Sequence, residues 1–182
     1  MRALLDANIL FPTVMREILL GAAAHGAFTP LWSARILEEW ARAVRRLGTD
    51  AQAIARAEIA LMHDRWPDAS VEDGDISEAD VFLPDRDDRH VLAAAINGNA
   101  HTLLTRNLKD FPTRVLAGHN IIRREPDGFL LEIARGKPSL MLDVITEVRR
   151  RAEAASGREQ PVRALLKRAG LPRLGKALAE PL

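Results

Sequence analysis

Short apolar runs of strand length alternate with longer segments of helical periodicity along the first two thirds of the chain. The runs stand before Asp6, within 26–31, near Val71, at 102–105 and at 120–123. Between them, apolar positions recur with helical spacing in 12–24, 34–47, 50–66 and 91–96. This alternation predicts an α/β fold with three layers (α/β/α), in which helices cover both faces of a mainly parallel sheet.

Acidic and amide side chains stand where the predicted strands end and where one helix starts. They are Asp6 after the first strand, Asp85, Asp87 and Asp88 before the run at 91–96, and Asn107 and Asp110 after the strand at 102–105. In an open parallel sheet these places lie along the same edge, where such folds bind ligands. The alternative is local: an isolated Asp commonly caps a turn or the next helix, and this reading applies most directly to Asp85 and Asp87.

The predicted helix at 34–47 adds a further acid. Its apolar stripe includes Leu37, Trp40 and Val44, and Glu38 and Glu39 lie on opposite flanks of that stripe. Helical periodicity does not decide which of the two glutamates turns toward the sheet edge, and a flanking acid is commonly solvated.

Several carboxylates that meet at one edge repel one another, unless a cation balances them or their pKa values rise. Hard divalent ions with oxygen ligands relieve this repulsion, and Mg²⁺ suits a shallow site because it keeps several of its waters. Phosphodiester hydrolysis is the reaction that such a site favours. The sequence contains no Gly-x-Ser-x-Gly or P-loop motif, and the stretch from Asp85 has His90 and Ile96 where an EF-hand loop needs Gly and Glu.

Composition narrows the class of protein further. The 182 residues are 47% hydrophobic and contain no cysteine, so disulfides and thiolate metal sites are excluded. No apolar run approaches the length of a membrane span, and the N-terminus does not resemble a signal peptide. We therefore expect a cytoplasmic (cytosolic) protein without membrane contact.

From Glu125 the chain changes character. Residues 1–124 are expected to form the α/β domain and 125–182 a helical C-terminal extension, with helices at 129–134, 140–155 and 162–169. The extension carries 11 Lys and Arg against 8 Asp and Glu. Its candidate phosphate contacts are Arg149, Arg150, Arg151, Arg158, Lys167 and Arg168. The alternative for these cations is a solvated helix face.

Four segments in this order and spacing resemble the PIN domain family, and most closely its VapC-type toxin ribonucleases. They are LDANI at 5–9, ILEEW at 36–40, PDRDDRHVLAAA at 84–95 and TRNLKDFP at 105–112. The resemblance covers roughly 1–123. It implies an α/β/α fold, endoribonuclease activity with Mg²⁺ or Mn²⁺, an RNA substrate, a cognate antitoxin protein and a homodimer.

The resemblance also implies roles for individual residues. Asp6, Glu39, Asp88 and Asp110 match the family's catalytic acids, with Asp6, Asp88 and Asp110 as metal ligands. Asn8, Thr105 and Asn107 are the expected supporting residues, and Asn107 stands where many members of the family carry a further Asp. Two other functions stay open: a non-catalytic PIN-like scaffold, and a nuclease of the same wider fold that acts on DNA or flap structures.

Overall fold

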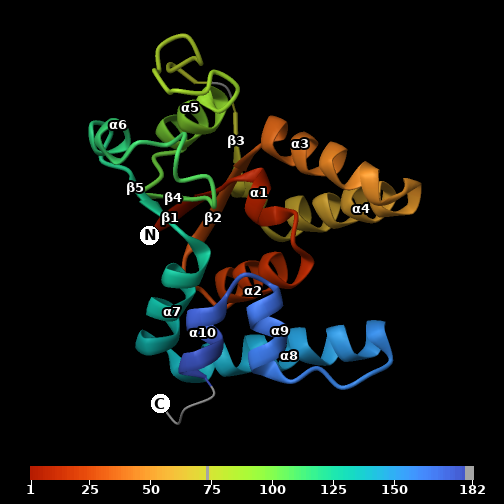
Figure 1. Cartoon of the computed structure of the whole chain (residues 1–182). Coiled ribbons are helices and arrows are strands. Elements are labelled where there is room, and N and C mark those ends of the chain that lie inside the picture. The colour runs from red at the N-terminus through yellow and green to blue at the C-terminus, as the bar shows by residue number, and fades with distance from the viewer. Residues whose placement is uncertain (73, 179–182) are drawn as a thin grey trace. The chain divides into compact units, whose positions relative to one another are not determined.

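The computed structural model describes residues 1–72 and 74–178, and its elements are labelled in Figure 1. The described chain forms two compact units, each made from two stretches of sequence. Unit 1 combines Met1–Phe11 with Thr29–Arg124, and unit 2 combines Pro12–Phe28 with the described residues from Glu125 onward. Among the described residues, no helix has the length and apolar character that crossing a membrane requires.

Within residues 1–72 and 74–178, unit 1 is built on a five-stranded sheet in the order β3-β2-β1-β4-β5, and every neighbouring pair is parallel. The strands are β1 Arg2–Leu5, β2 Thr29–Ser33, β3 Ser70–Val71, β4 Thr102–Leu104 and β5 Ile122–Arg124. Ala3, Leu4 and Leu5 of β1 are fully buried, as expected for a central strand covered on both faces. The predicted α/β class with a parallel sheet is confirmed.

The strand order reverses direction at β1 and β4, which are neighbours in the middle of the sheet. Leu5 of β1 lies opposite Leu104 of β4, and the backbone N–H of Asp6 donates to the Leu104 carbonyl at 3.1 Å. Asp6 and Thr105 therefore leave the sheet side by side at its carboxyl edge. This is the position where open α/β sheets form their ligand-binding crevice.

The longer helices of unit 1 arise where the hydrophobic periodicity predicts them, at 34–47, 50–66 and 91–96, whereas two short helices at 7–10 and 113–117 lie outside the predicted segments. The helices are α1 Ala7–Leu10, α3 Ala34–Val44, α4 Thr49–Arg65, α5 Arg89–Asn97 and α6 Thr113–Ala117, with 3₁₀ turns at Arg45–Leu47 and Pro67–Ala69. The Ser33 side chain caps α3 by accepting from the Ile36 N–H at 3.3 Å. Figure 1 shows α3 and α4 on one side of the sheet and α5 and α6 on the other, as right-handed crossovers give for this strand order.

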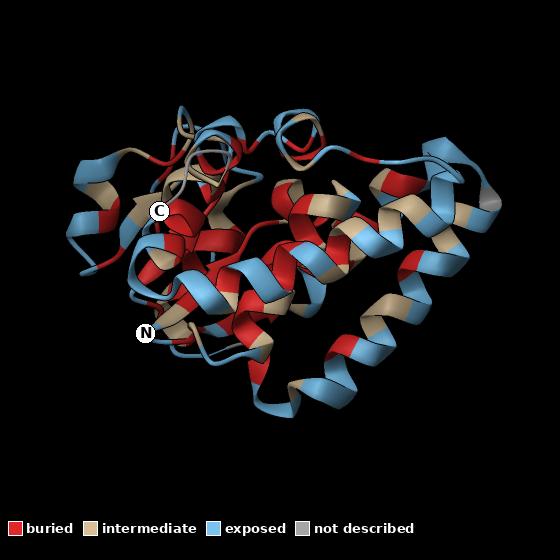
Figure 2. Ribbon diagram, turned by 90° about the horizontal axis from the view of Figure 1, so that it is seen from below, coloured by how far each residue is buried: buried red, intermediate tan, exposed pale blue. Residues whose placement is uncertain are grey.

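Unit 2 is helical throughout its described part. Its helices are α2 Thr13–Ala24, α7 Pro126–Gly136, α8 Pro138–Ser156, α9 Val162–Arg168 and α10 Pro172–Ala177. Helices α2 and α8 approach closely at Gly21, because a Cβ atom added there would lie 2.8 Å from Cγ1 of Val144. Figure 2 shows that most helices have one buried side and one exposed side. Val144, Ile145 and Val148 form the buried side of α8.

Two features of unit 2 differ from what the sequence led us to expect. Helix α10 was not predicted, because its segment is short and begins with Pro172. Helix α2, expected within the α/β domain, packs against α8 of the C-terminal segment. The division into a domain at 1–124 and an extension at 125–182 remains a prediction.

Candidate functional site

Asp6 lies directly after β1 and is the most enclosed of the candidate acids, with 5% of its surface exposed. It stands at the N-cap position of α1, but its side chain makes no capping hydrogen bond there. The Thr105 hydroxyl instead donates to Asp6 Oδ2 at 2.6 Å, and Asn8 Nδ2 donates to the same oxygen at 2.5 Å. Burial raises the pKa of Asp6, the Thr105 hydrogen bond opposes that rise, and the charge of Glu39 adds to it.

Asn8 and Thr105 connect the ends of β1 and β4. Asn8 Nδ2 also donates to Thr105 Oγ1 at 3.0 Å, and Asn8 Oδ1 accepts from the backbone N–H of Arg106 at 3.0 Å. Thr105 Oγ1 further accepts from the backbone N–H of Asn107 at 2.9 Å. These bonds fix the start of the segment that carries Asn107 and Asp110 relative to Asp6.

Three carboxylates gather next to this network. One oxygen each from Asp85, Asp88 and Asp110 lies within 4.8 Å of the others. Asp88 immediately precedes α5, and its Oδ2 accepts from Asn107 Nδ2 at 2.9 Å. The structure therefore brings Asp88, Asp110 and Asn107 together, as the sequence predicts, and adds Asp85 to them.

The charges in this cluster act on one another. Burial, followed by the negative charges of Asp6, Asp85 and Asp110, raises the pKa of Asp88 to about 6. Asp6 is thus close enough to Asp88 to influence its protonation, although it is not one of the three acids within 4.8 Å. Ionising Asp88 therefore places a further negative charge beside these acids.

Glu39 and Glu38 are adjacent on α3 but face different partners. Glu39 Oε1 lies 2.9 Å from Nε2 of His90 and 3.4 Å from Nε of Arg35, and its charge acts on Asp6. Glu38 pairs with Arg42 at 2.9 Å and with Arg56 of α4 at 3.1 Å. Of the two glutamates, Glu39 is therefore the one on the side of the acid cluster.

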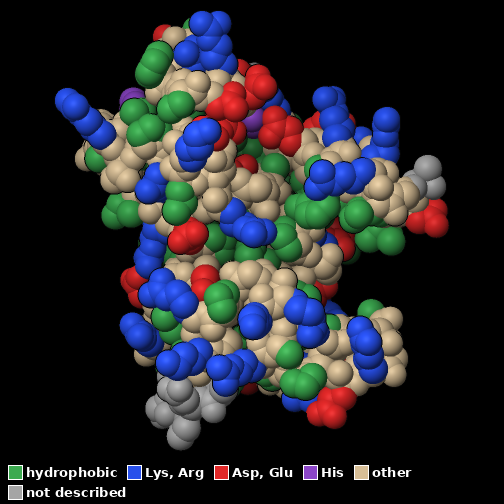
Figure 3. Space-filling model, viewed as in Figure 1, with side chains coloured by type: hydrophobic (Ala, Val, Ile, Leu, Met, Phe, Trp, Pro, Cys, Tyr) green, Lys and Arg blue, Asp and Glu red, His purple; other side chains and the backbone are tan. Residues whose placement is uncertain are grey.

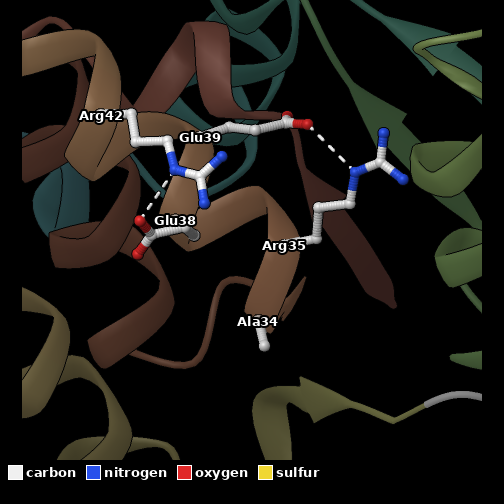
Figure 4. Close-up of a pocket in the computed structure, with 5 residues that line it drawn as sticks. All are labelled: Ala34, Arg35, Glu38, Glu39 and Arg42. Carbon is white, nitrogen blue, oxygen red and sulfur yellow. Dashed lines mark hydrogen bonds and ion pairs between the residues drawn. The ribbon is translucent and has the colours of Figure 1, made fainter.

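The surface of α3 beside Glu39 is hollowed into a pocket of about 560 Å³. Its lining residues are Ala34, Arg35, Glu38, Glu39 and Arg42, and Figure 4 shows the two glutamates extending apart, each toward its own arginine. Burial favours protonation of Glu39, but the hydrogen bond and charge of His90, followed by those of Arg35, outweigh it and lower the pKa of Glu39. Glu39 therefore stays ionised at neutral pH, as a base or a water-orienting group must.

The segment that carries Asp110 is held from β5. The Arg123 guanidinium donates from Nη1 to the Leu108 carbonyl and, at 2.8 Å, to the Phe111 carbonyl. These acceptors flank Asp110 on both sides along the chain. Arg123 therefore fixes the loop after β4 in the conformation that presents Asp110 to Asp88.

Sequence reasoning missed three contributors to this site. Asp85 was expected to order its own loop, and its Oδ1 does accept from the Asp87 N–H at 2.9 Å, but its carboxylate also joins the acid cluster. His90 and Arg123 carried no recognisable signal, because their roles depend on contacts with segments distant in sequence. The spacing of Asp85 and Asp88, three residues apart, was the one available indication for Asp85.

The donor set fits a hard divalent cation. Asp85, Asp88 and Asp110 offer carboxylate oxygens only, the ligand type that Mg²⁺, Mn²⁺ and Ca²⁺ prefer. The raised pKa of Asp88 supports the same conclusion, since a cation would offset both the burial of the carboxylate and the repulsion from Asp6, Asp85 and Asp110 that raise this pKa.

Comparison of the sequence with known proteins finds a partial relative and a family model. A "Putative ribonuclease VapC50" from Mycobacterium tuberculosis is 49% identical to the chain over 45 residues, which are 25% of this chain and 27% of that protein. The match thus spans about a quarter of that relative. No solved structure matches the chain. The family model described as the PIN domain matches residues 2–109, which is more than half of the chain, and the protein therefore belongs to the PIN domain family.

Proposed function

We propose that the protein is an endoribonuclease that hydrolyses RNA phosphodiesters with Mg²⁺ or Mn²⁺, and that it is the toxin of a type II toxin–antitoxin pair. The main support is the acid cluster: Asp85, Asp88 and Asp110 offer oxygens within 4.8 Å of one another, and Asp6 is close enough to raise the pKa of Asp88. Membership of the PIN domain family and the name of the mycobacterial relative support the same activity.

Each side chain has a role in this proposal. Asp6, Asp88 and Asp110 hold the cation, and Asp85 adds a fourth carboxylate at the exposed side. A bound divalent ion supplies a polarised phosphoryl oxygen and a water of lowered pKa. Glu39, kept ionised by His90 and Arg35, accepts a proton from the attacking water. Asn8, Thr105 and Asn107 orient the carboxylates through the hydrogen bonds described above.

The proposal extends to partners. The substrate is RNA, a cognate antitoxin protein blocks the site, and the chain acts as a homodimer in the cytoplasm. The supports are the PIN domain match and the name of the mycobacterial relative.

The direct test is RNA cleavage by the purified chain in Mn²⁺, Mg²⁺ or EDTA. Cleavage should need the ion, and Asp6→Asn should lower kcat by about 100-fold or more, the scale of losing one catalytic group. Cleavage in EDTA that survives Asp6→Asn would reject the mechanism. A DNA strand of the same sequence, offered in competition, separates a ribonuclease from a DNA-directed nuclease.

The adjacent glutamates provide a matched pair for the proton acceptor. Glu39→Gln should lower kcat by about 100-fold, because the amide cannot accept the proton. Glu38→Gln removes the same charge one residue away, where the side chain pairs with Arg42 and Arg56, and should leave kcat close to that of the native chain. Equal losses in the two variants would contradict the assignment of Glu39.

A further inference from the structure

Helices α9 and α10 of unit 2 form a surface whose charged side chains are all positive. Residues 162–178 contain five Lys and Arg and no Asp or Glu. All five are exposed, and the Arg168 guanidinium donates to the Gln160 side chain. The other four are Arg163 and Lys167 of α9 and Arg173 and Lys176 of α10. Figure 3 shows Lys and Arg side chains gathered over these helices. We call these four residues the α9–α10 basic surface.

The cations of α8 differ from those of this surface. Arg150 and Arg151 each bind Glu147 at 2.8 Å, and Arg149 binds Glu153 at 2.8 Å. Their charges are therefore largely balanced by nearby acids. Among the described residues, no acid forms an ion pair with Arg163, Lys167, Arg173 or Lys176, so α9 and α10 carry unbalanced positive charge.

The two helices that carry the four cations are well packed. Leu165, Leu166, Leu171 and Leu174 are buried on the opposite side of the two helices. A Cβ atom added at Gly175 would lie 3.2 Å from Cβ of Leu166, so α9 and α10 approach closely. The Asp127 carboxylate accepts from the backbone N–H groups of Arg173 and Leu174 at 2.9 Å, which fixes the start of α10.

The chemistry of this surface indicates its partner. A membrane-binding helix needs large exposed apolar side chains beside its cations, and protein interfaces concentrate aromatic anchors. In residues 161–176 the exposed residues are cations, Pro161, Gly170 and Pro172, while every leucine is buried. A row of phosphates, by contrast, is bound by Lys and Arg alone.

We propose that the α9–α10 basic surface binds the phosphate backbone of RNA, so that unit 2 supplies a substrate contact separate from the acid cluster. The choice of RNA as the polyanion rests on the proposed function. Because phosphate contacts are electrostatic, this binding should be independent of sequence and should weaken steeply with salt.

The test measures binding of the full-length chain to a fluorescein-labelled single-stranded RNA in EDTA, where no metal-dependent cleavage occurs. The variant Arg163→Gln/Lys167→Gln/Arg173→Gln/Lys176→Gln should bind at least about tenfold more weakly at 0.1 M salt. Its slope of log affinity against log salt should fall by up to about 3, since each contact with a single strand contributes about 0.7. The variant Arg149→Gln/Arg150→Gln/Arg151→Gln is the matched control, and it should change the slope little because these charges are already paired.

Three outcomes would overturn the proposal. The first is an unchanged salt slope in the α9–α10 variant, and the second is an equal fall of the salt slope in the α8 control. The third is an α9–α10 variant that loses binding to phosphatidylglycerol vesicles but binds RNA as the native chain does. Circular dichroism and thermal unfolding of both variants check that the fold is intact. The binding assay needs no cleavage, so it separates this inference from the proposed function. If the native chain cleaved no RNA but the α9–α10 variant still showed the lower salt slope, the proposed function would be rejected and this inference would stand.

Discussion

The pKa of Asp88 depends on the burial and the charges of its surroundings. Burial of its carboxyl, followed by the negative charges of Asp6, Asp85 and Asp110, raises its pKa from the ordinary 3.8 to about 6. The folded chain therefore holds a proton on Asp88 more tightly than the unfolded chain does. The resulting stabilisation is fully present below about pH 4 and is lost as the pH rises through about 6.

This linkage predicts the behaviour of Asp88→Asn without metal. At pH 7.5 in EDTA the native carboxylate is ionised and repelled, so the neutral variant should have the higher free energy of unfolding. The difference should shrink toward pH 5, where the native Asp88 is largely protonated. Urea unfolding at the two pH values measures it, and addition of Mn²⁺ at pH 7.5 should stabilise the native chain more than the variant. A variant less stable than the native chain at pH 7.5 in EDTA would contradict the charge argument.

A single glycine, Gly21, allows helix α2 to pack closely against α8. Gly21 lies inside the helix, where Ala would be favoured by about 1 kcal/mol on helix propensity alone. A methyl group there would meet Val144 Cγ1 at 2.8 Å, and the β-branched Val144 has little rotamer freedom in its own helix. Overpacking of this kind typically costs about 1–3 kcal/mol.

We therefore predict that Gly21→Ala lowers the free energy of unfolding by about 1 kcal/mol. Gly136→Ala is the matched control, because no atom lies within 4 Å of its added Cβ, and it should be neutral or slightly stabilising. Urea denaturation compares the two. Gly21→Ala should cost less in a Val144→Ala background, because the Cγ atoms that meet the added methyl group are then absent. A Gly21→Ala variant more stable than the native chain would show that α2 and α8 can separate without cost.

The elements also show what a sequence can and cannot predict. The strands before Asp6 and Thr105 were predictable, because fully buried parallel strands are short apolar runs that end at polar residues. Their carboxyl ends then had to share an edge, which predicted that Asp88, Asn107 and Asp110 meet. Periodicity reveals that α2 has an apolar side but not which helix covers it, and for this reason its packing against α8 was missed. Asp85 was missed because its local hydrogen bond to Asp87 accounts for an Asp at that position equally well.

At the scale of the whole molecule, the two compact units do not follow the order of the sequence. Pro12–Phe28 precedes most of unit 1 but is packed with the helices after Glu125. The described part of unit 2 is therefore built from two segments that are distant in the sequence. Cutting the chain after Arg124 would separate these two segments and leave α2 without the helices it packs against.

We predict that the truncated chain 1–124 is less stable than the full chain and prone to aggregate. Removal of α7 and α8 would expose the side of α2 that packs against them, around Gly21. Thermal unfolding and binding of a hydrophobic dye measure the effect, and addition of the separate fragment 125–182 should reverse part of it. A monomeric 1–124 that unfolds at the same temperature as the full chain would contradict this prediction.

The interleaving of the two units has a consequence during translation. Thr29–Arg124 is synthesised between the two stretches that make unit 2, so α2 leaves the ribosome well before α7 and α8 exist. At about 5–20 residues per second, that interval lasts about 5 to 20 seconds. Asp6 and Asp110, together with the strands β1 and β4 that precede them, are already synthesised by then, so the nascent chain can assemble its acid site before the helices that pack against α2 exist.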